Sequence, residues 1–128
     1  MQEQNKKNIC IIGSGFAGLS AATHLVEKGN NVYILEKNST LFHNEKIKLH
    51  QGDAVQFTSQ TQVEKFDIIF ADPPYTKVDY FDLKKLIKPF LNEDGVFCME
   101  MKRCFINDET ARIKKYGSTQ VVFWRAKA

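Results

Sequence analysis

The sequence predicts an α/β protein built on a mostly parallel sheet. Several short runs are apolar at nearly every position, and a stretch with helical spacing separates the first two of them. Such runs are typical of strands that are covered on both faces. A strand, a helix and a strand within about 30 residues form a right-handed unit, from which parallel sheets are built. The 128 residues suffice for one hydrophobic core, so we expect residues 1–128 to form a single domain.

The N-terminal third of the chain carries this first unit. Asn8–Ile12 is a short apolar run and is expected to form a buried strand. Leu19–Lys28 follows with apolar residues on one helical face, and Gly29 is expected to end this helix. Asn31–Glu36 is the second buried strand, and it closes on an acidic residue.

Two more strands are expected in the middle of the chain. Lys37–Glu45 is polar and has no clear period, where a doubly wound sheet would normally place a helix. Lys46–His50 alternates between polar and apolar residues and predicts a third strand, whereas Val55–Glu64 fits a short helix or a loop. Phe66–Phe70 is apolar except at Asp67 and predicts a fourth buried strand.

Residues 80–91 fit an amphipathic helix. Its inward face is expected to hold Phe81, Leu83, Leu86, Ile87, Phe90 and Leu91, and its outward face Lys84, Lys85 and Lys88. Because proline has no backbone N–H, Pro89 predicts that the helix is kinked near its end or ends early.

The C-terminal part predicts a turn at Asn92–Gly95, a fifth strand at Val96–Met101 and a short helix at Asn107–Arg112. Ile113–Tyr116 and Gln120–Arg125 flank a Gly-Ser pair and predict an antiparallel hairpin at the edge of the sheet. The elements together predict a Rossmann-like, doubly wound sheet, mostly parallel, with an antiparallel C-terminal hairpin.

Composition excludes several classes of protein. A hydrophobic fraction of 43% and a charged fraction of 26% are ordinary for a globular chain, and no apolar run reaches the roughly 20 residues of a membrane span. We therefore expect a cytoplasmic protein without membrane contact. Cys10 and Cys98 lie in apolar stretches and are expected to be buried, and the scattered cysteines and histidines predict no metal site. The net charge of +3 permits nucleic-acid binding without arguing for it.

The first candidate site is a glycine-rich turn. Gly13, Gly15 and Gly18 match the pattern G-x-G-x-x-G between a predicted strand and a predicted helix, and Glu36 closes the next strand. The first glycine allows a tight turn, the second lets a ligand approach the backbone, and the third permits close helix packing. Glu36 would accept hydrogen bonds from ribose hydroxyls. The alternative is a tight turn that holds no ligand.

The second candidate site is the tetrapeptide Asp72-Pro73-Pro74-Tyr75, which follows the fourth predicted strand. An exocyclic base amine is a poor nucleophile because its lone pair is delocalised into the ring. Hydrogen bonds to the Asp72 carboxylate and to a carbonyl fixed by the two prolines would favour a more tetrahedral nitrogen. Tyr75 could stack on the base. The alternative is a turn that carries this sequence by chance.

Residues 8–38 resemble the N-terminal dinucleotide-binding unit of FAD-dependent oxidoreductases of the amine oxidase and phytoene desaturase kind. The likeness rests on residues 11–22, which include the glycine-rich turn, and on residues 32–37. It implies that Gly13, Gly15 and Gly18 meet a pyrophosphate and that Glu36 binds a ribose.

Residues 46–126 resemble class I S-adenosylmethionine-dependent methyltransferases that act on an exocyclic base nitrogen. Among these methyltransferases, this part of the chain most resembles the family of bacterial enzymes that methylate guanine N2 of 16S ribosomal RNA. The likeness rests on residues 52–54, 66–75, 95–97 and 116–125. It implies a catalytic role for Asp72, Pro73, Pro74 and Tyr75, and it places Asp53 and Ala54 beside the cofactor adenine.

Three interpretations therefore remain open on the sequence. The chain is an S-adenosylmethionine-dependent methyltransferase with RNA as substrate, active or weakened; it is a module that binds FAD or NAD; or it is a folded but inert hybrid of the two families. In the hybrid, which could be a chimera, the junction falls between Asn38 and Lys46. The oligomeric state is not predicted.

Overall fold

The computed structural model describes residues 6–13, 23–36, 47–51, 65–71 and 79–127, and for Glu36 and residues 47–51 it describes the backbone alone. The predicted elements at Lys37–Glu45 and Val55–Glu64, and residues 19–22 of the first helix, lie outside the described residues.

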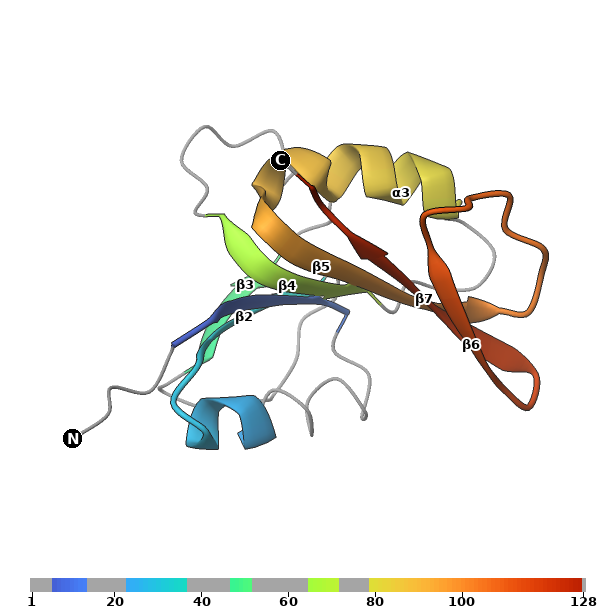
Figure 1. Cartoon of the computed structure of the whole chain (residues 1–128). Helices are drawn as coiled ribbons and strands as arrows, with labels where there is room; N and C mark the ends of the chain where they lie inside the picture. The colour runs from blue at the N-terminus through green and yellow to red at the C-terminus, as the bar shows by residue number, and fades with distance from the viewer. Residues whose placement is uncertain (1–5, 14–22, 37–46, 52–64, 72–78, 128) are drawn as a thin grey trace.

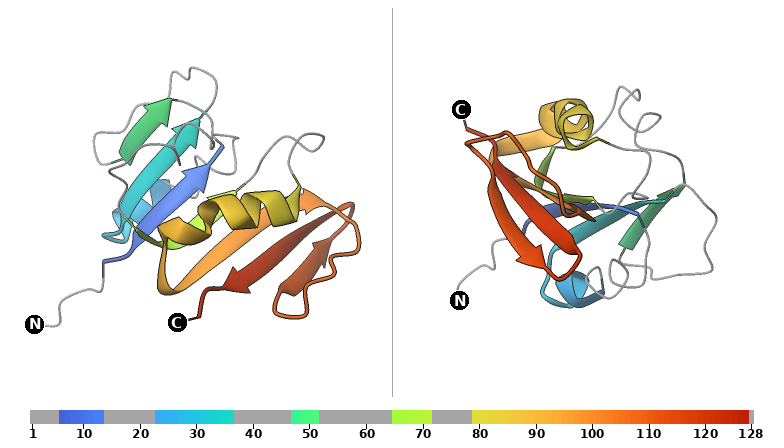
Figure 2. Two further views of the ribbon diagram at one scale, coloured as in Figure 1. Left: turned by 90° about the horizontal axis from the view of Figure 1, so that it is seen from above. Right: turned by 90° about the vertical axis from the view of Figure 1, so that its right-hand side faces the viewer.

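The described strands form one seven-stranded sheet (Figure 1). They are β1 (Asn8–Ile12), β2 (Asn31–Glu36), β3 (Ile47–Gln51), β4 (Phe66–Ala71), β5 (Leu91–Lys102), β6 (Arg112–Tyr116) and β7 (Thr119–Arg125). Their order in the sheet is β3-β2-β1-β4-β5-β7-β6. The first five run parallel, β7 is antiparallel to β5, and β6 is antiparallel to β7. This confirms the predicted mostly parallel sheet with an antiparallel hairpin at its end (Figure 2).

Helical segments lie on opposite faces of the sheet, as a doubly wound fold requires (Figure 1). Ile9 and Ile11 of β1 pack on the face where the helical segment 23–27 contributes Val26. Cys10 packs on the other face, beneath α3 (Tyr80–Ile87). The alternation along β1 is the period of two that a strand imposes. Because both faces of the sheet are covered here, the buried residues Ile9, Cys10 and Ile11 are all apolar.

The segment 23–27 ends as the sequence predicts. Gly29 has a φ of 90°, and its N–H donates to the carbonyl of Val26 at 3.0 Å. The N–H of Asn30 donates to the carbonyl of Leu25 at 3.2 Å. These two bonds form the Schellman arrangement, which satisfies carbonyls at the helix end and favours glycine at the position of positive φ.

Pro89 ends α3 early, as one of the two predicted outcomes. The helix stops at Ile87 and continues as the 3-10 turn η1 (Lys88–Phe90). The predicted inward face is wrong at one position, since Phe81 is 43% exposed and Tyr80 is fully buried in its place. The buried residues of the helix are Tyr80, Leu83 and Ile87, which recur at intervals of three and four and so share one face.

The predicted turn at residues 92–95 is a bulged start of β5 instead. The strand begins at Leu91, and its register against β4 shifts between the pair Phe66–Leu91 and the pair Ile68–Val96. Asp94 takes a φ of 62° inside this bulge. The turn-forming residues therefore bend the strand without ending its pairing, because β4 supplies partners on both sides of the bulge.

Gly95 is confined within the bulge, and we expect Gly95→Ala to lower the free energy of unfolding by about 1–3 kcal/mol, the cost of overpacking. An added Cβ would lie 2.8 Å from the carbonyl oxygen of Asn92 and 3.1 Å from that of Phe66, and backbone atoms cannot rotate away. Urea unfolding measures the effect. Gly117→Asn is the control, because a Cβ there meets nothing within 4 Å and asparagine tolerates the φ of 55°. Equal stabilities of Gly95→Ala and wild type would contradict the steric argument.

The hairpin at the sheet edge is confirmed. Tyr116 pairs with Thr119, and Gly117 has the positive φ that a two-residue turn of type II′ requires at its first position. The short helix predicted at Asn107–Arg112 is wrong. Asp108 accepts from the N–H of Thr110 at 3.0 Å and from its hydroxyl at 2.6 Å, so the side chain organises a turn instead.

Two cysteines are buried, as expected. Burial raises the pKa of Cys10 to about 12 and that of Cys98 to about 11, so both thiols stay protonated at neutral pH. They pack as small hydrophobic side chains.

Candidate active site

The two candidate motifs converge on one edge of the sheet. Ile12, the last residue of β1, pairs with Leu35 of β2 on one side and with Ala71 of β4 on the other. Gly13 follows β1 directly and Asp72 follows β4 directly. Because β1 and β4 are parallel neighbours, the glycine-rich turn and the Asp-Pro-Pro-Tyr segment both begin at the carboxyl ends of adjacent strands.

This edge is the topological switch point of the sheet. From β1 the chain continues to β2 and β3 on one side, and it then crosses to β4 and β5 on the other. Connections that leave in opposite directions open a crevice outside the carboxyl ends of the two central strands, and ligands of open α/β sheets bind there. The order of the strands therefore predicts a ligand site between the ends of β1 and β4.

Gly13 shows the geometry that the glycine-rich motif requires of its first position. Its N–H donates to the carbonyl of Leu35 at 2.8 Å, which extends the pairing with β2 by one residue. Its φ is 104°, a conformation that residues with a Cβ rarely adopt. The chain thus leaves the sheet sharply at this glycine.

The acid of the first motif lies at the same edge. Glu36 is the last residue of β2 and pairs with Gln51, the last residue of β3. Asp53 and Ala54 come within three residues of that strand end. Gly15, Gly18, Asp53, Ala54, Asp72, Pro73, Pro74 and Tyr75 themselves lie outside the described residues. The structure places the strand ends from which they depart.

A partly buried polar cluster fixes the helix that follows the Asp-Pro-Pro-Tyr segment. Asp79 caps α3 by accepting from the N–H of Asp82 at 3.4 Å. The hydroxyl of the next residue, Tyr80, donates to Asp108 at 3.0 Å, and the Lys84 ammonium, one turn further on, donates to the same carboxylate at 2.7 Å. The loop before β6 is thereby tied to the first turns of α3, seven residues downstream of Pro73.

The charges in this cluster are held in defined states. Burial would raise the pKa of Asp108, but hydrogen bonds from Lys84, Thr110 and Tyr80 outweigh it and hold that pKa well below its ordinary value. Burial, followed by the bond to the Asp108 carboxylate, raises the pKa of Tyr80 above its ordinary range. Lys84 also lies over Trp124, with its Nζ 4.3 Å from the ring centroid.

The sequence reasoning missed Asp108 because Asn107–Arg112 was taken for a short helix. The spacing Asp-Glu-Thr carries the signal for the observed turn, since an aspartate side chain often accepts from the backbone two residues on. Asp108 forms its salt bridge with Lys84, which is 24 residues away in the sequence. No local pattern identifies that pairing.

The residues that the structure describes contain neither a metal-binding cluster nor a membrane-spanning helix. No group of three or more side chains among His, Cys, Asp and Glu is placed there to hold a metal ion. No helix in the same residues is long and apolar enough to cross a membrane.

Comparison with known proteins shows that most of the chain matches one protein family. Residues 12–125 match the model of the family described as Conserved hypothetical protein 95. No curated protein sequence matches the chain with significance.

Solved structures of related fold agree with this match. A methyltransferase candidate of Escherichia coli, yhhF, gives a TM-score of 0.76 at 13% identity, over 96% of this chain and 77% of that one. A conserved hypothetical protein of Streptococcus pyogenes gives 0.78 at 19% identity, over 97% and 88% of the two chains. Human methyltransferase-like protein 13, in complex with SAH, gives 0.70 at 13% identity, over 94% and 72%. At these identities the likeness shows the fold.

The single family match bears on the flavoprotein resemblance. It runs from residue 12 to residue 125 and so includes both the glycine-rich turn and the Asp-Pro-Pro-Tyr segment. The comparisons give no support to a separate, flavoprotein origin for residues 8–38 or to a junction between Asn38 and Lys46.

Proposed function

The chain belongs to the methyltransferase-type family described as Conserved hypothetical protein 95, and we propose that it methylates an exocyclic base nitrogen of RNA with S-adenosylmethionine. Guanine N2 of ribosomal RNA is the proposed target. One observation carries the proposal: β4, which Asp72 follows in the sequence, ends beside β1 and Gly13 at the switch point of the sheet.

The residues at the edge fit this cofactor. Gly13 turns the backbone out of the sheet without a side chain, which leaves room for a ligand above the end of β1. Glu36 closes β2, and a carboxylate there can accept from both hydroxyls of a ribose. Asp53 follows β3 and is proposed to accept from the adenine amino group, beside Ala54. Gly15 and Gly18 are proposed to continue the turn beneath the cofactor.

The proposed chemistry depends on acceptors that are fixed in advance. S-adenosylmethionine supplies a methyl group bound to a positively charged sulfur. Asp72 and a carbonyl of the Pro73-Pro74 segment accept from the target amine, which exposes its lone pair to that methyl group. A carbon–nitrogen bond would form as the carbon–sulfur bond breaks and S-adenosylhomocysteine leaves, and the proton lost by the amine would pass to the Asp72 carboxylate or to water. Tyr75 holds the base by stacking, so that nitrogen and methyl carbon meet in line.

Cofactor binding tests the proposal first. We expect calorimetry to detect S-adenosylmethionine or S-adenosylhomocysteine, and Glu36→Ala to weaken the affinity about 10- to 100-fold, as the loss of hydrogen bonds to a carboxylate predicts. Glu93→Ala is the matched control, because it removes an equal charge from an exposed position in the bulge of β5. Absence of heat at millimolar ligand, or binding of FAD or NAD in its place, would contradict the proposed cofactor.

The substrate is tested by product analysis. Unmethylated ribosomal RNA is incubated with the protein and labelled S-adenosylmethionine, then digested to nucleosides. We expect the label in N2-methylguanosine. Label in another base would keep the methyltransferase and correct the target.

A further inference from the structure

One face of the C-terminal strands presents basic side chains to solvent. In a paired set of strands, residues directly opposite each other share a face. Val96 pairs with Arg125, Phe123 with Arg112, and Val121 with Lys114. The face opposite α3 therefore carries Arg112, Lys114 and Arg125, all exposed.

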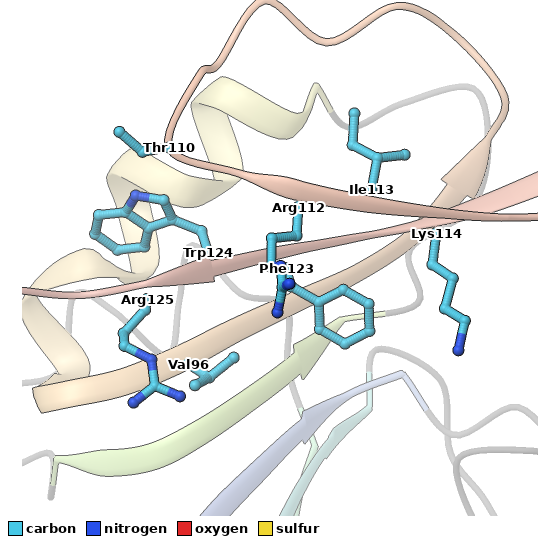
Figure 3. Close-up of a pocket in the computed structure, with 8 residues that line it drawn as sticks. All are labelled: Val96, Thr110, Arg112, Ile113, Lys114, Phe123, Trp124 and Arg125. Atoms are coloured by element: carbon cyan, nitrogen blue, oxygen red, sulfur yellow. The ribbon is translucent and has the colours of Figure 1, made fainter.

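The close-up view shows these side chains together (Figure 3). Arg112, Lys114, Phe123 and Arg125 extend to one side of the strands, and Trp124 extends to the other. All five residues are among those that line an open hollow of about 430 Å³ along β5, β7 and β6. We call Arg112, Lys114, Arg125, Phe123 and Tyr116 the hairpin face.

Positive charge dominates the hairpin face. Between Val96 and Lys102 of β5, the same side of the sheet also carries Glu100 and Lys102. The ion pair that the described residues contain joins Lys84 and Asp108, on the side of α3. The cations of the hairpin face are thus available to an anionic partner.

Aromatic rings lie between these cations. Tyr116 is 51% exposed, and the Lys114 ammonium lies 5.7 Å from the centroid of its ring. Phe123 is half-buried between Arg112 and Cys98, its two paired neighbours. Cations that alternate with aromatic rings suit a nucleic acid strand, because the cations bind phosphates while the rings stack on bases.

Along the strand direction, the hairpin face spans the level of the candidate active edge. Tyr116 pairs with Thr119, and Thr119 pairs with Lys102 at the carboxyl end of β5. Met99 of β5 pairs with Ala71, the residue before Asp72. A strand rises about 3.3 Å per residue. Arg112, level with Phe70, therefore lies about 3 Å before the end of β4 along the strand direction, and Tyr116, level with Lys102, lies about 10 Å beyond it.

We propose that the hairpin face binds a single-stranded segment of the RNA substrate and guides it to the edge where Asp72 departs. The identification of RNA as partner rests on the proposed function. The contacts are sequence-independent, since Arg112, Lys114 and Arg125 meet phosphates and Tyr116 stacks on whichever base it meets.

The test measures binding of a fluorescein-labelled single-stranded RNA of about 20 nucleotides by anisotropy, at several salt concentrations and without cofactor. The triple variant Arg112→Ala/Lys114→Ala/Arg125→Ala is expected to bind at least about 10-fold more weakly at low salt. Each lost phosphate contact lowers the salt slope by about 0.7 for a single strand, so the slope should fall by about 2.

The control variant Lys85→Ala/Lys115→Ala/Lys127→Ala removes the same charge from exposed positions outside the hairpin face. We expect it to bind within about 2-fold of the wild type, apart from a small effect of net charge. Melting temperatures of both variants verify that they fold, and calorimetry with S-adenosylmethionine checks the cofactor site separately.

Several results would overturn the proposal. One is an equal loss of RNA binding in both triple variants, and another is a wild-type protein that does not bind the RNA. Retention of wild-type affinity by the hairpin-face variant would remove the surface and leave the proposed function standing. If that variant loses RNA binding while the wild-type protein binds no S-adenosylmethionine, the hairpin face would stand as an RNA-binding surface and the proposed function would fall. Binding to phosphatidylserine vesicles but not to RNA, or a dimer that only this variant disrupts, would assign the face to a membrane or to a second copy.

Discussion

Asp72→Ala is expected to slow methyl transfer by about 10²- to 10³-fold, the usual effect of removing one preorganised polar group from a reacting centre. The affinity for S-adenosylmethionine should stay within about 2-fold of wild type, because Asp72 departs from β4 whereas the proposed ribose contact departs from β2. Single-turnover rates with saturating RNA and cofactor measure the chemical step apart from binding.

Asp72→Asn refines the comparison. It retains one acceptor oxygen but loses the negative charge, so its rate should lie between those of wild type and Asp72→Ala. Glu93→Ala again serves as the control of equal charge. A wild-type rate in Asp72→Ala would exclude the proposed role of the carboxylate, and a rate loss explained entirely by weaker cofactor binding would reassign it.

Asp108→Ala is expected to lower the free energy of unfolding by about 1–3 kcal/mol, because it leaves the partly buried Lys84 ammonium without its acceptor. The side chains of Lys84 and Asp108 are 19% and 8% exposed, so water cannot replace the lost carboxylate fully. The hydroxyl of Tyr80 loses its acceptor in the same step. Urea unfolding gives the change.

The double variant Lys84→Ala/Asp108→Ala separates the ion pair from its surroundings. Its loss of stability should be smaller than the sum of the two single losses, because the double variant removes both members of the pair and leaves neither charge without a partner. Additive losses would show that the pair contributes nothing beyond packing. Asp82→Ala, at an exposed position on α3, gives the scale of an unrelated carboxylate.

The same cluster predicts a pH dependence. The pKa of Asp108 in the folded protein lies below its unfolded value of about 3.9, so its contribution is present above that pH and is lost as the pH falls below it. The pKa of Tyr80 lies above its unfolded value of about 10, so its contribution is present below that pH and is lost as the pH rises beyond it. Asp108→Ala should therefore unfold with a flatter dependence on pH below about 4 than wild type.

Local patterns predicted the parts of the fold that local forces determine. Apolar runs identified β1, β2 and β4, and Gly29 identified a helix end, because these depend on neighbouring residues along the chain. The bulge before Val96 depends on pairing with β4, so turn-forming residues alone were misleading. Tyr80 shares the buried face of α3 with Leu83 and Ile87. Its hydroxyl also donates to Asp108, a partner 28 residues away that no local pattern identifies.

The candidate site was likewise predictable from local sequence only in part. Gly13 and Glu36 could be assigned to strand ends from the sequence, because each follows or closes an apolar run. That Asp72 departs beside Gly13 requires the strand order, which brings β4 next to β1. The hairpin face was not predicted, because its cations share a side only through the register of three strands.

The position of β6 has a consequence for how this protein behaves in concentrated solution. It is the last of the described strands of the sheet, and all five of its residues are exposed. Among the residues that the structure describes, one row of its backbone N–H and C=O groups has no neighbouring strand. Such an edge can template pairing with another molecule, and lysines and arginines oppose it by repulsion. We expect Arg112, Lys114 and Lys115 to keep these edges apart. If the proposed RNA neutralises these charges, aggregation should depend on how much RNA is present.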